Sequence, residues 1–385
     1  MRRIAIALLA LLALAAVAYL AFVPPARSQT LNASVQSTPP QIIEGFARAD
    51  GVRAFSFPQD FGPHPDFQTE WWYYTGNLET ADGRHFGYQL TFFRRGILPP
   101  DQLPARSSEW AASQLYMAHF TVTDVEASTF YSHERFSRGA AGLAGAQGEP
   151  YAVWLEDWRA EASGPGTFTL HAEAEGLVLE LSLQDAKGPI LQGDRGYSRK
   201  GDEPGNASYY YSQTRLVTEG SLQIGDERFE LSGLSWKDHE FSTSVLTSEI
   251  AGWDWFSIQL DSGYELMVYQ LRRADGSIAP RSSGTLVAPD GSTTQLFAED
   301  FVLTPLSTWR SPHSGAEYPA SWSLSLPAHN LTLEITPFLR DQELNHTFTY
   351  WEGAIEIAGS QNGQAVAGSG YVELTGYAEP FNGEF

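Results

Sequence analysis

A repeating alternation of apolar and polar residues constrains the fold of this chain more than any other feature. Beyond residue 50 it recurs in short segments, such as "HFGYQLTFF" (85–93), "LVLELSL" (177–183) and "LTLEI" (331–335). A strand points successive side chains to opposite faces, so each segment is typical of a strand with one apolar face. Asp-Gly pairs at 82–83, 275–276 and 290–291 supply hairpin turns. Short strands joined by turns predict an all-β sandwich or barrel.

An aromatic hairpin pattern occurs twice. "WWYYTGNLETADGRHFGYQLTFFRR" (71–95) resembles "WDWFSIQLDSGYELMVYQLRR" (253–273), because each runs from a tryptophan-rich strand through a glycine turn to a pair of arginines. At about 100–200 residues per domain, 385 residues suit two domains. A spacing near half the chain predicts a duplicated β domain, with domains at 46–240 and 241–385. Chance similarity between two aromatic hairpins is the alternative.

The first 28 residues have the pattern of an export signal. Two arginines precede an apolar run over residues 4–23. The run is about as long as a membrane-spanning helix, so a cleaved signal peptide and an uncleaved anchor in the cytoplasmic membrane both stay open. With the arginines held inside, the rest of the chain would be periplasmic or secreted. Residues 29–45 are polar, contain two prolines and predict a linker.

Composition excludes several classes of function. The 46 acidic residues outnumber 24 lysines and arginines, and the net charge of −22 repels nucleic acid. The chain has no cysteine, which excludes disulfides, thiolate zinc sites and a cysteine nucleophile. It has no Gly-x-Ser-x-Gly elbow, no His-Glu-x-x-His spacing and no phosphate-binding glycine loop. Any chemistry is therefore expected from side chains alone, without metal or cofactor.

Eight motifs in a fixed order resemble one known family. They are "FPQDFGPHPDFQTEWWYYTGNL", "GYQLTFFRR", "MAHFTVTD", "YSHERFSRGAAGLAG", "KGPILQGDRGYSRKG", "SYYYSQTRL", "GLSWKDHEF" and "WDWFSIQL". Together, from about residue 55 to the C-terminus, they are similar to the AttH-like family of exported bacterial proteins, which is related to carotenoid hydratase (hydroxyneurosporene synthase). The resemblance implies two lipocalin-like β-barrel domains. Where the family commonly has an apolar residue and a tryptophan around its acidic pair, this chain has Lys237 and Phe241.

The motif "SWKDHEF" (235–241) is the densest ionisable cluster with aromatic neighbours. In an extended strand, Trp236, Asp238 and Glu240 share one face, and His239 lies on the other. Two carboxylates on one face could hold a single proton, because like charges raise one of the two pKa values. We therefore take Asp238 and Glu240 as candidate catalytic acids, and His239 as a further candidate catalytic residue. Solvated charges on an edge strand, or ion pairs between the domains, are the alternative.

An acid of this kind suits the addition of water to an isolated alkene. It protonates the double bond, a tertiary carbocation forms, and water captures the cation. Aromatic faces stabilise a desolvated cation by up to ~2 kcal/mol per ring. Candidate ligand-binding rings are Trp71, Trp72, Tyr73 and Trp236. Because "EWWYY" (70–74) puts rings on both faces of one strand, we expect one face in a barrel lumen and the other against the neighbouring domain.

Three further candidates each have an open alternative. Glu70 could be a second catalytic acid, or could pair with Arg94 or Arg95 in the neighbouring strand. His119 could be a proton shuttle in the ligand site, or a hydrogen-bonded core histidine. Tyr210 in "SYYYSQTR" could line a pocket or simply pack.

These patterns lead to one expected function and two alternatives. We expect an exported lipocalin-like protein that binds a hydrophobic isoprenoid or lipid ligand and hydrates an isoprenoid double bond without a cofactor. A non-catalytic lipophile carrier, or a periplasmic accessory of an envelope transporter, is the first alternative. A secreted hydrolase, the label some family members carry, is the second.

Overall fold

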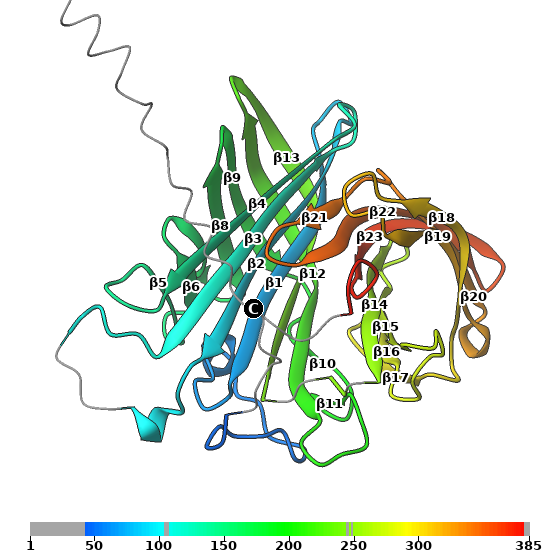
Figure 1. Ribbon diagram of the computed structural model, residues 1–385. Coiled ribbons are helices and arrows are strands. Elements are labelled where there is room, and N and C mark those ends of the chain that lie inside the picture. The colour runs from blue at the N-terminus through cyan, green and yellow to red at the C-terminus, as the bar shows by residue number, and fades with distance from the viewer. Residues whose placement is uncertain (1–42, 104–107, 244–245, 248, 381–385) are drawn as a thin grey trace, which may run out of the picture. The chain divides into compact units, whose positions relative to one another are not determined.

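The computed structural model describes residues 43–103, 108–243, 246–247 and 249–380 (Figure 1). The predicted export segment 1–28 and most of the linker 29–45 lie outside the described residues. Within the described part, no helix has the length and apolar character needed to cross a membrane.

The first sheet is antiparallel throughout and contains 13 strands in the described part of the chain. Its path runs β4-β3-β2-β1-β13-β12-β9-β8-β7-β6-β5, and β10 and β11 pair with β12. β1 pairs with β2 on one side and with the last strand β13 on the other, so the start and the end of the sheet's sequence lie side by side (Figure 1). The bounds are β1 (Thr69–Glu79), β2 (His85–Gly96), β3 (Gln114–Asp124), β4 (Thr129–Arg138), β5 (Ala144–Gln147), β6 (Ala152–Leu155), β7 (Trp158–Gly164), β8 (Thr167–Ala174), β9 (Leu177–Asp185), β10 (Ile190–Leu191), β11 (Tyr197–Arg199), β12 (Ala207–Ile224) and β13 (Glu227–Ser242).

The second sheet repeats this plan with 10 strands over the described residues. Its path runs β17-β16-β15-β14-β23-β22-β20-β19-β18, with β21 on β22. The bounds are β14 (Ile250–Leu260), β15 (Glu265–Arg273), β16 (Ser283–Val287), β17 (Thr293–Phe297), β18 (Val302–Arg310), β19 (Glu317–Leu326), β20 (Leu331–Pro337), β21 (Glu343–Asn345), β22 (Thr349–Gln361) and β23 (Gln364–Leu374). Short 3₁₀ turns are η1 (Gln59–Phe61), η2 (Pro100–Gln102) and η3 (Pro327–His329).

The topology agrees with the sequence repeat. In each sheet the first strand pairs with the second strand and with the last, β1 with β2 and β13, and β14 with β15 and β23. Trp71 and Trp253 therefore lie in equivalent strands. The prediction of an all-β fold is confirmed, with two barrel-like sheets. One sheet ends at Ser242 and the other begins at Ile250; the domain division 46–240 and 241–385 stays a prediction.

Strand alternation separates two faces of the first sheet. Trp72 and Tyr74 of β1 belong to the apolar core inside the first sheet, whereas Tyr73 packs in a separate cluster with residues of the second sheet. On β13, Trp236 lies in that same inter-sheet cluster. The expectation that one face of "EWWYY" fills a barrel and the other meets the neighbouring domain is confirmed by this arrangement.

Buried polar contacts fix the two sheets against each other. Glu265 of β15 pairs with Lys187 at 2.6 Å and with Arg215 of β12 at 2.5 Å. Asn77 of β1 donates to the carbonyl of Gly370 in β23 at 2.9 Å. Residues far apart in the sequence are thus held in register across the space between the sheets.

Candidate functional site

A cavity of about 180 Å³ lies between the two sheets. At roughly 10–15 Å³ for each water-sized group, it has room for about 12–18 such groups. The first sheet and its loops contribute Thr69, Trp71, Tyr73, Phe93, Lys200, Ser208, Tyr210, Asp238, Glu240 and Ser242. The second sheet and the segments beside it contribute Leu246, Trp253, Trp255, Tyr269, Leu271, Phe348, Tyr350, Glu373 and Thr375.

Aromatic rings from the two equivalent strands line the cavity. Trp71 and Tyr73 come from β1, and Trp253 and Trp255 come from β14. Tyr73 and Trp255 meet edge to face, with ring centroids 5.2 Å apart. Such walls suit an apolar ligand, and their electron-rich faces also favour a positive charge.

Asp238 is a buried carboxylic acid at this cavity. Trp236 Nε1 donates to its Oδ1 at 2.7 Å, and Ser212 Oγ also donates to Oδ1. The Tyr210 hydroxyl bonds Oδ2 at 2.6 Å. Burial raises the pKa of Asp238 to about 7, although these three hydrogen bonds favour its charged form. At neutral pH, Asp238 is therefore still protonated in a large fraction of the protein molecules.

Glu240 lies on the same strand face but has a different partner. Lys200 Nζ lies 3.2 Å from its Oε1 and 4.3 Å from the centre of the Tyr269 ring. Burial favours the neutral amine, but the Glu240 carboxylate outweighs it and raises the pKa of Lys200. The sequence pattern predicted that the like charge of Glu240 raises the pKa of Asp238. This prediction is corrected, because burial is the main cause of the raised pKa and Glu240 adds a smaller effect. Glu240 is instead an ion-paired carboxylate.

Glu352 and Glu373 form a carboxyl pair that sequence reasoning missed. They are direct cross-strand partners on β22 and β23, and both are buried. Tyr73 donates its hydroxyl to Glu352, and Trp253 Nε1 donates to Glu373 at 2.6 Å. Burial raises the pKa of Glu373 to about 7 and raises that of Glu352 well above its ordinary value. Their one signal in the sequence is a single glutamate within each of two apolar strands, "TYWEGAI" and "GYVELTG".

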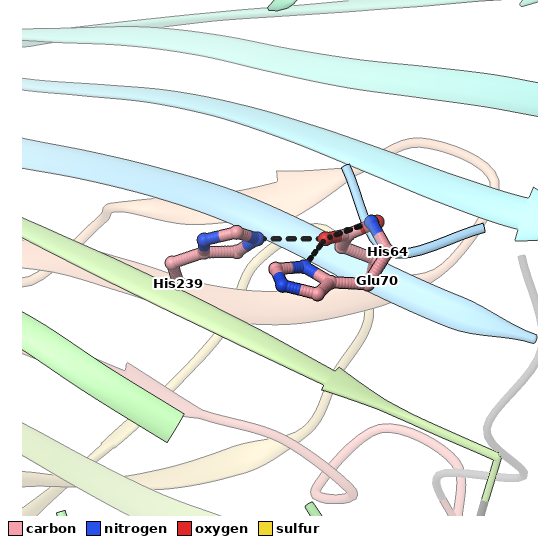
Figure 2. Close-up of side chains that lie close together, drawn as sticks. All are labelled: His64, Glu70 and His239. Carbon is pink, nitrogen blue, oxygen red and sulfur yellow. Dashed lines mark hydrogen bonds and ion pairs between the residues drawn. The ribbon is translucent and has the colours of Figure 1, made fainter. Parts of the chain in front are cut away.

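Glu70 lies on the opposite face of β1, inside the first sheet. Arg94 Nε bonds its Oε2 at 2.9 Å, which is the alternative that the sequence left open. Figure 2 shows that His64 Nδ1 and His239 Nε2 both approach Oε1, each at 2.8 Å. Burial alone would raise the pKa of Glu70, but Arg94 and the two imidazoles hold it well below its ordinary range. Glu70 is therefore a buried, fully paired anion.

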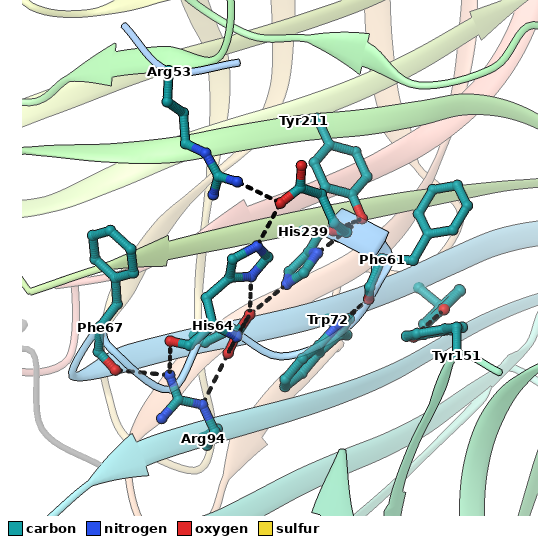
Figure 3. Close-up of polar contacts among 12 residues, drawn as sticks. Arg53, Phe61, His64, Phe67, Trp72, Arg94, Tyr151, Tyr211 and His239 are labelled. Carbon is teal, nitrogen blue, oxygen red and sulfur yellow. Dashed lines mark hydrogen bonds and ion pairs between the residues drawn. The ribbon is translucent and has the colours of Figure 1, made fainter. Parts of the chain in front are cut away.

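His239 is neutral in this network. Burial lowers its pKa to about 4, although Glu70 opposes the shift. Trp72 stacks on the His239 ring at 5.0 Å and donates Nε1 to the Phe61 carbonyl at 3.1 Å. Figure 3 shows Trp72, His239 and Phe61 within one hydrogen-bonded network. Neither Trp72 nor His239 lines the cavity, because strand alternation points them the other way.

His64, Glu70 and His239 are also the buried group that could hold a metal ion among the described residues. Two imidazoles and a carboxylate are a donor set that zinc accepts. The same atoms already bond one another, and the Arg94 cation lies 2.9 Å from the carboxylate. We assign the group a structural role, because hydrogen bonds satisfy its donor atoms and a second cation would face the arginine.

His64 extends the network toward the segment before β1. Its Nε2 bonds Asp60 at 2.8 Å, and Arg53 bonds the same carboxylate oxygen at 2.6 Å (Figure 3). Burial opposes a charge on His64, but Asp60 and Glu70 prevail and raise its pKa. Basic and acidic groups thus alternate from Arg53 through Asp60, His64 and Glu70, a pattern that ties residues 53–64 to the first sheet.

The structure brings together some predicted site residues and separates others. Those at the cavity are Trp71, Tyr73, Tyr210, Asp238 and Glu240, with Trp236 directly behind Asp238. Those inside the first sheet are Glu70, Trp72 and His239. His119 is fully buried on β3 and bonds Tyr350, which does line the cavity.

Comparisons with known proteins agree with this fold. A family model described as AttH-like matches residues 48–377. An AttH protein of Nitrosomonas europaea of known crystal structure is 36% identical; the match covers 86% of this chain and 100% of that one, with a TM-score of 0.77. Kievitone hydratase of Nectria haematococca is 14% identical over 87% of this chain and 96% of its own, with a TM-score of 0.67. CghA is 14% identical over 89% and 96%, with a TM-score of 0.52. A search of curated proteins gave no match.

Proposed function

The chain belongs to the AttH-like family, and on that premise we propose that its inter-sheet cavity binds a small hydrophobic alkene, isoprenoid or lipid, and adds water to a C=C bond without a cofactor. One observation carries this proposal: Asp238 is a buried acid with a pKa near 7 in an aromatic cavity. A general acid works best when its pKa lies near the operating pH.

The proposed reaction begins with proton transfer from Asp238 to one alkene carbon. The π bond breaks, a new C–H bond forms, and the neighbouring carbon becomes a carbocation. The rings of Trp71 and Trp253 would stabilise this cation, by up to ~2 kcal/mol each when desolvated. Water then forms the C–O bond and loses a proton, so that the product is the alkene plus one water molecule.

The size of the cavity limits what it encloses. Room for about 12–18 water-sized groups matches roughly two to three prenyl units of five carbons each. A longer isoprenoid chain would have to extend beyond the enclosed space. The fold of the chain is shared with a protein named as a hydratase, which supports hydration as the reaction class at the level of fold.

A non-catalytic carrier of lipophiles is the second candidate. The aromatic walls alone would serve binding, whether or not a proton is transferred. This carrier would be exported to the periplasm or beyond, could be anchored in the cytoplasmic membrane and could serve an envelope transporter. The export pattern of residues 1–28 supports this part of the proposal. A hydrolase has less support, since the chain lacks a nucleophile elbow.

Hydration is tested with geranylacetone, which has two isolated trisubstituted double bonds, in ¹⁸O-labelled water. Wild-type protein should form the tertiary alcohol with ¹⁸O in its hydroxyl, measured by mass spectrometry. Asp238→Asn should reduce turnover by about 10²–10⁴-fold while tryptophan-quenching affinity stays nearly unchanged. Asp82→Asn, in an exposed hairpin turn, is the control and should behave as wild type. Binding without turnover in wild type would favour the carrier.

A further inference from the structure

A chain of three side chains connects the cavity to the surface across both sheets. Tyr350 of β22 lines the cavity, and its hydroxyl lies 2.7 Å from Nδ1 of His119 on β3. Nε2 of His119 lies 3.0 Å from Glu134, its cross-strand partner on β4. His119 is fully buried, whereas the Glu134 side chain is 14% exposed. The first and last members thus reach the cavity and the solvent, with a buried imidazole between them.

The hydrogen-bond partners determine the tautomer of His119. Burial opposes a charge on Glu134, but bonds from His119 and from Thr347 lower the pKa of its carboxyl, which is then an acceptor only. Nε2 of His119 must therefore carry the hydrogen. The Tyr350 oxygen accepts a bond from Gln89 Nε2 at 3.3 Å. Among the described partners of Tyr350, only His119 Nδ1 can then accept the Tyr350 proton.

This arrangement has the order carboxylate, imidazole, hydroxyl that activates a hydroxyl in hydrolytic triads. Here the hydroxyl is a phenol at a cavity. Burial, with nearby Glu352 and Glu373, raises the pKa of Tyr350 well above its ordinary value. The phenol is therefore suited to pass a proton on rather than to store a negative charge.

We propose that Tyr350, His119 and Glu134 are the proton relay that deprotonates the attacking water. The proposal rests on the proposed hydration and names its general base. Tyr350 is the catalytic residue that touches the water, and His119 and Glu134 act through it.

The proton balance of the relay is complete. As the water oxygen bonds the carbocation, one water O–H bond breaks and its proton moves to the Tyr350 oxygen. The Tyr350 proton moves to Nδ1 of His119, and the imidazolium that forms is stabilised by Glu134. Asp238 has meanwhile given its own proton to the neighbouring carbon. The enzyme resets when the proton on Nδ1 of His119 returns through the Tyr350 oxygen to a new water that enters the cavity after the product leaves, and from that water to Asp238. This restores the Nε2–H tautomer of His119 and the protonated Asp238.

Tyr350→Phe separates the relay from the acid step. Geranylacetone is incubated in water that contains both deuterium and ¹⁸O, with wild type and variant. Deuterium in recovered alkene reports carbocation formation through Asp238, because the cation can lose a proton again; ¹⁸O in the alcohol reports capture of water. We expect Tyr350→Phe to lose about 10²-fold or more of ¹⁸O incorporation and to keep deuterium exchange within about twofold. Tyr371→Phe, a buried tyrosine of the inter-sheet cluster that does not line the cavity, is the matched control.

The possible results distinguish the two proposals. Loss of both labels to the same extent in Tyr350→Phe, or loss of neither, would overturn the relay. Loss of both in Asp238→Asn with loss of ¹⁸O alone in Tyr350→Phe supports both proposals. Absence of both labels in wild type would contradict hydration of this probe. The ¹⁵N NMR signals of His119 would then test the relay without a substrate.

Nitrogen NMR of the ¹⁵N-histidine-labelled protein provides that second test without any substrate. The His119 signal, assigned by its loss in His119→Gln, should show a protonated Nε2 and a hydrogen-bonded, unprotonated Nδ1. Tyr350→Phe should remove the hydrogen bond at Nδ1 and leave Nε2 unchanged. An Nδ1–H tautomer, or no change in Tyr350→Phe, would refute the relay whatever the activity.

Discussion

The state of Asp238 can be measured from folding alone. Its pKa of about 7 in the fold lies above the ordinary value of 3.8, and burial is the main cause. The fold therefore favours the neutral acid. The stability linked to this group is fully present below pH 4 and is lost as the pH rises through about 7. At about 1.4 kcal/mol per pKa unit, the complete loss is roughly 4 kcal/mol as an upper limit.

Asp238→Asn removes this loss because the amide has no charge at any pH. Its oxygen can still accept from Trp236 and Ser212, and its nitrogen can face the Tyr210 oxygen. Any packing cost of the amide should be the same at every pH. Relative to wild type, the variant should therefore gain stability from pH 4 to pH 8, by up to about 4 kcal/mol.

Equilibrium urea unfolding, followed by tryptophan fluorescence between pH 4 and pH 8.5, measures this difference. Asp82→Asn is the control, since an exposed turn carboxyl should give a flat difference above pH 5. A difference between Asp238→Asn and wild type that does not change over this range would refute the burial argument. A difference that falls with pH would show that Asp238 is a stabilising anion, and the general acid would have to be sought at Glu373.

Three further predictions concern the two faces of the first sheet. Trp71→Ala should weaken the binding of geranylacetone, measured by fluorescence, with little loss of stability. Trp72→Ala should instead destabilise the core by about 3–5 kcal/mol in urea unfolding. Equal effects of the two variants on binding would contradict the assignment of Trp71 and Trp72 to opposite faces. Glu70→Gln should cost about 3–5 kcal/mol in the same assay, because Arg94 would be left buried without its anion, and a cost below 1 kcal/mol would contradict this. Lys237 Nζ lies among five aromatic rings, and burial lowers its pKa to about 7, so the side chain is charged in the fold only below that pH. Lys237→Met should therefore stabilise the protein most below pH 7 and progressively less toward pH 10 in urea unfolding. A gain in stability that does not depend on pH would argue against a buried charge.

Some of the site was predictable because strand periodicity is local. The alternation of two residues places Asp238 with Glu240 and opposite His239 in any extended strand, and the structure keeps this division. The same rule separates Trp71 from Trp72, although the aromatic run predicted both as ligand-binding rings. Here the rule was available, and the density of aromatic residues obscured it.

Other features depend on contacts that no local pattern contains. Glu373 is brought beside the strand of Asp238 by the packing of one sheet on the other, and Tyr350 reaches His119 across 231 positions of the chain. Lys200 reaches Glu240 and not Asp238, and its position beside them depends on the fold of the first sheet.

The sequence by itself therefore determined the all-β class, the duplicated plan and the partition of each strand into two faces, because all three follow from periodicity and repetition along the chain. Only the tertiary structure decided which face borders a cavity, which carboxyls keep a proton and which partners complete the relay. Burial and pairing are properties of the space between the sheets, and that space is lined by residues such as Trp71 and Trp253, which border one cavity only when both sheets have folded and packed.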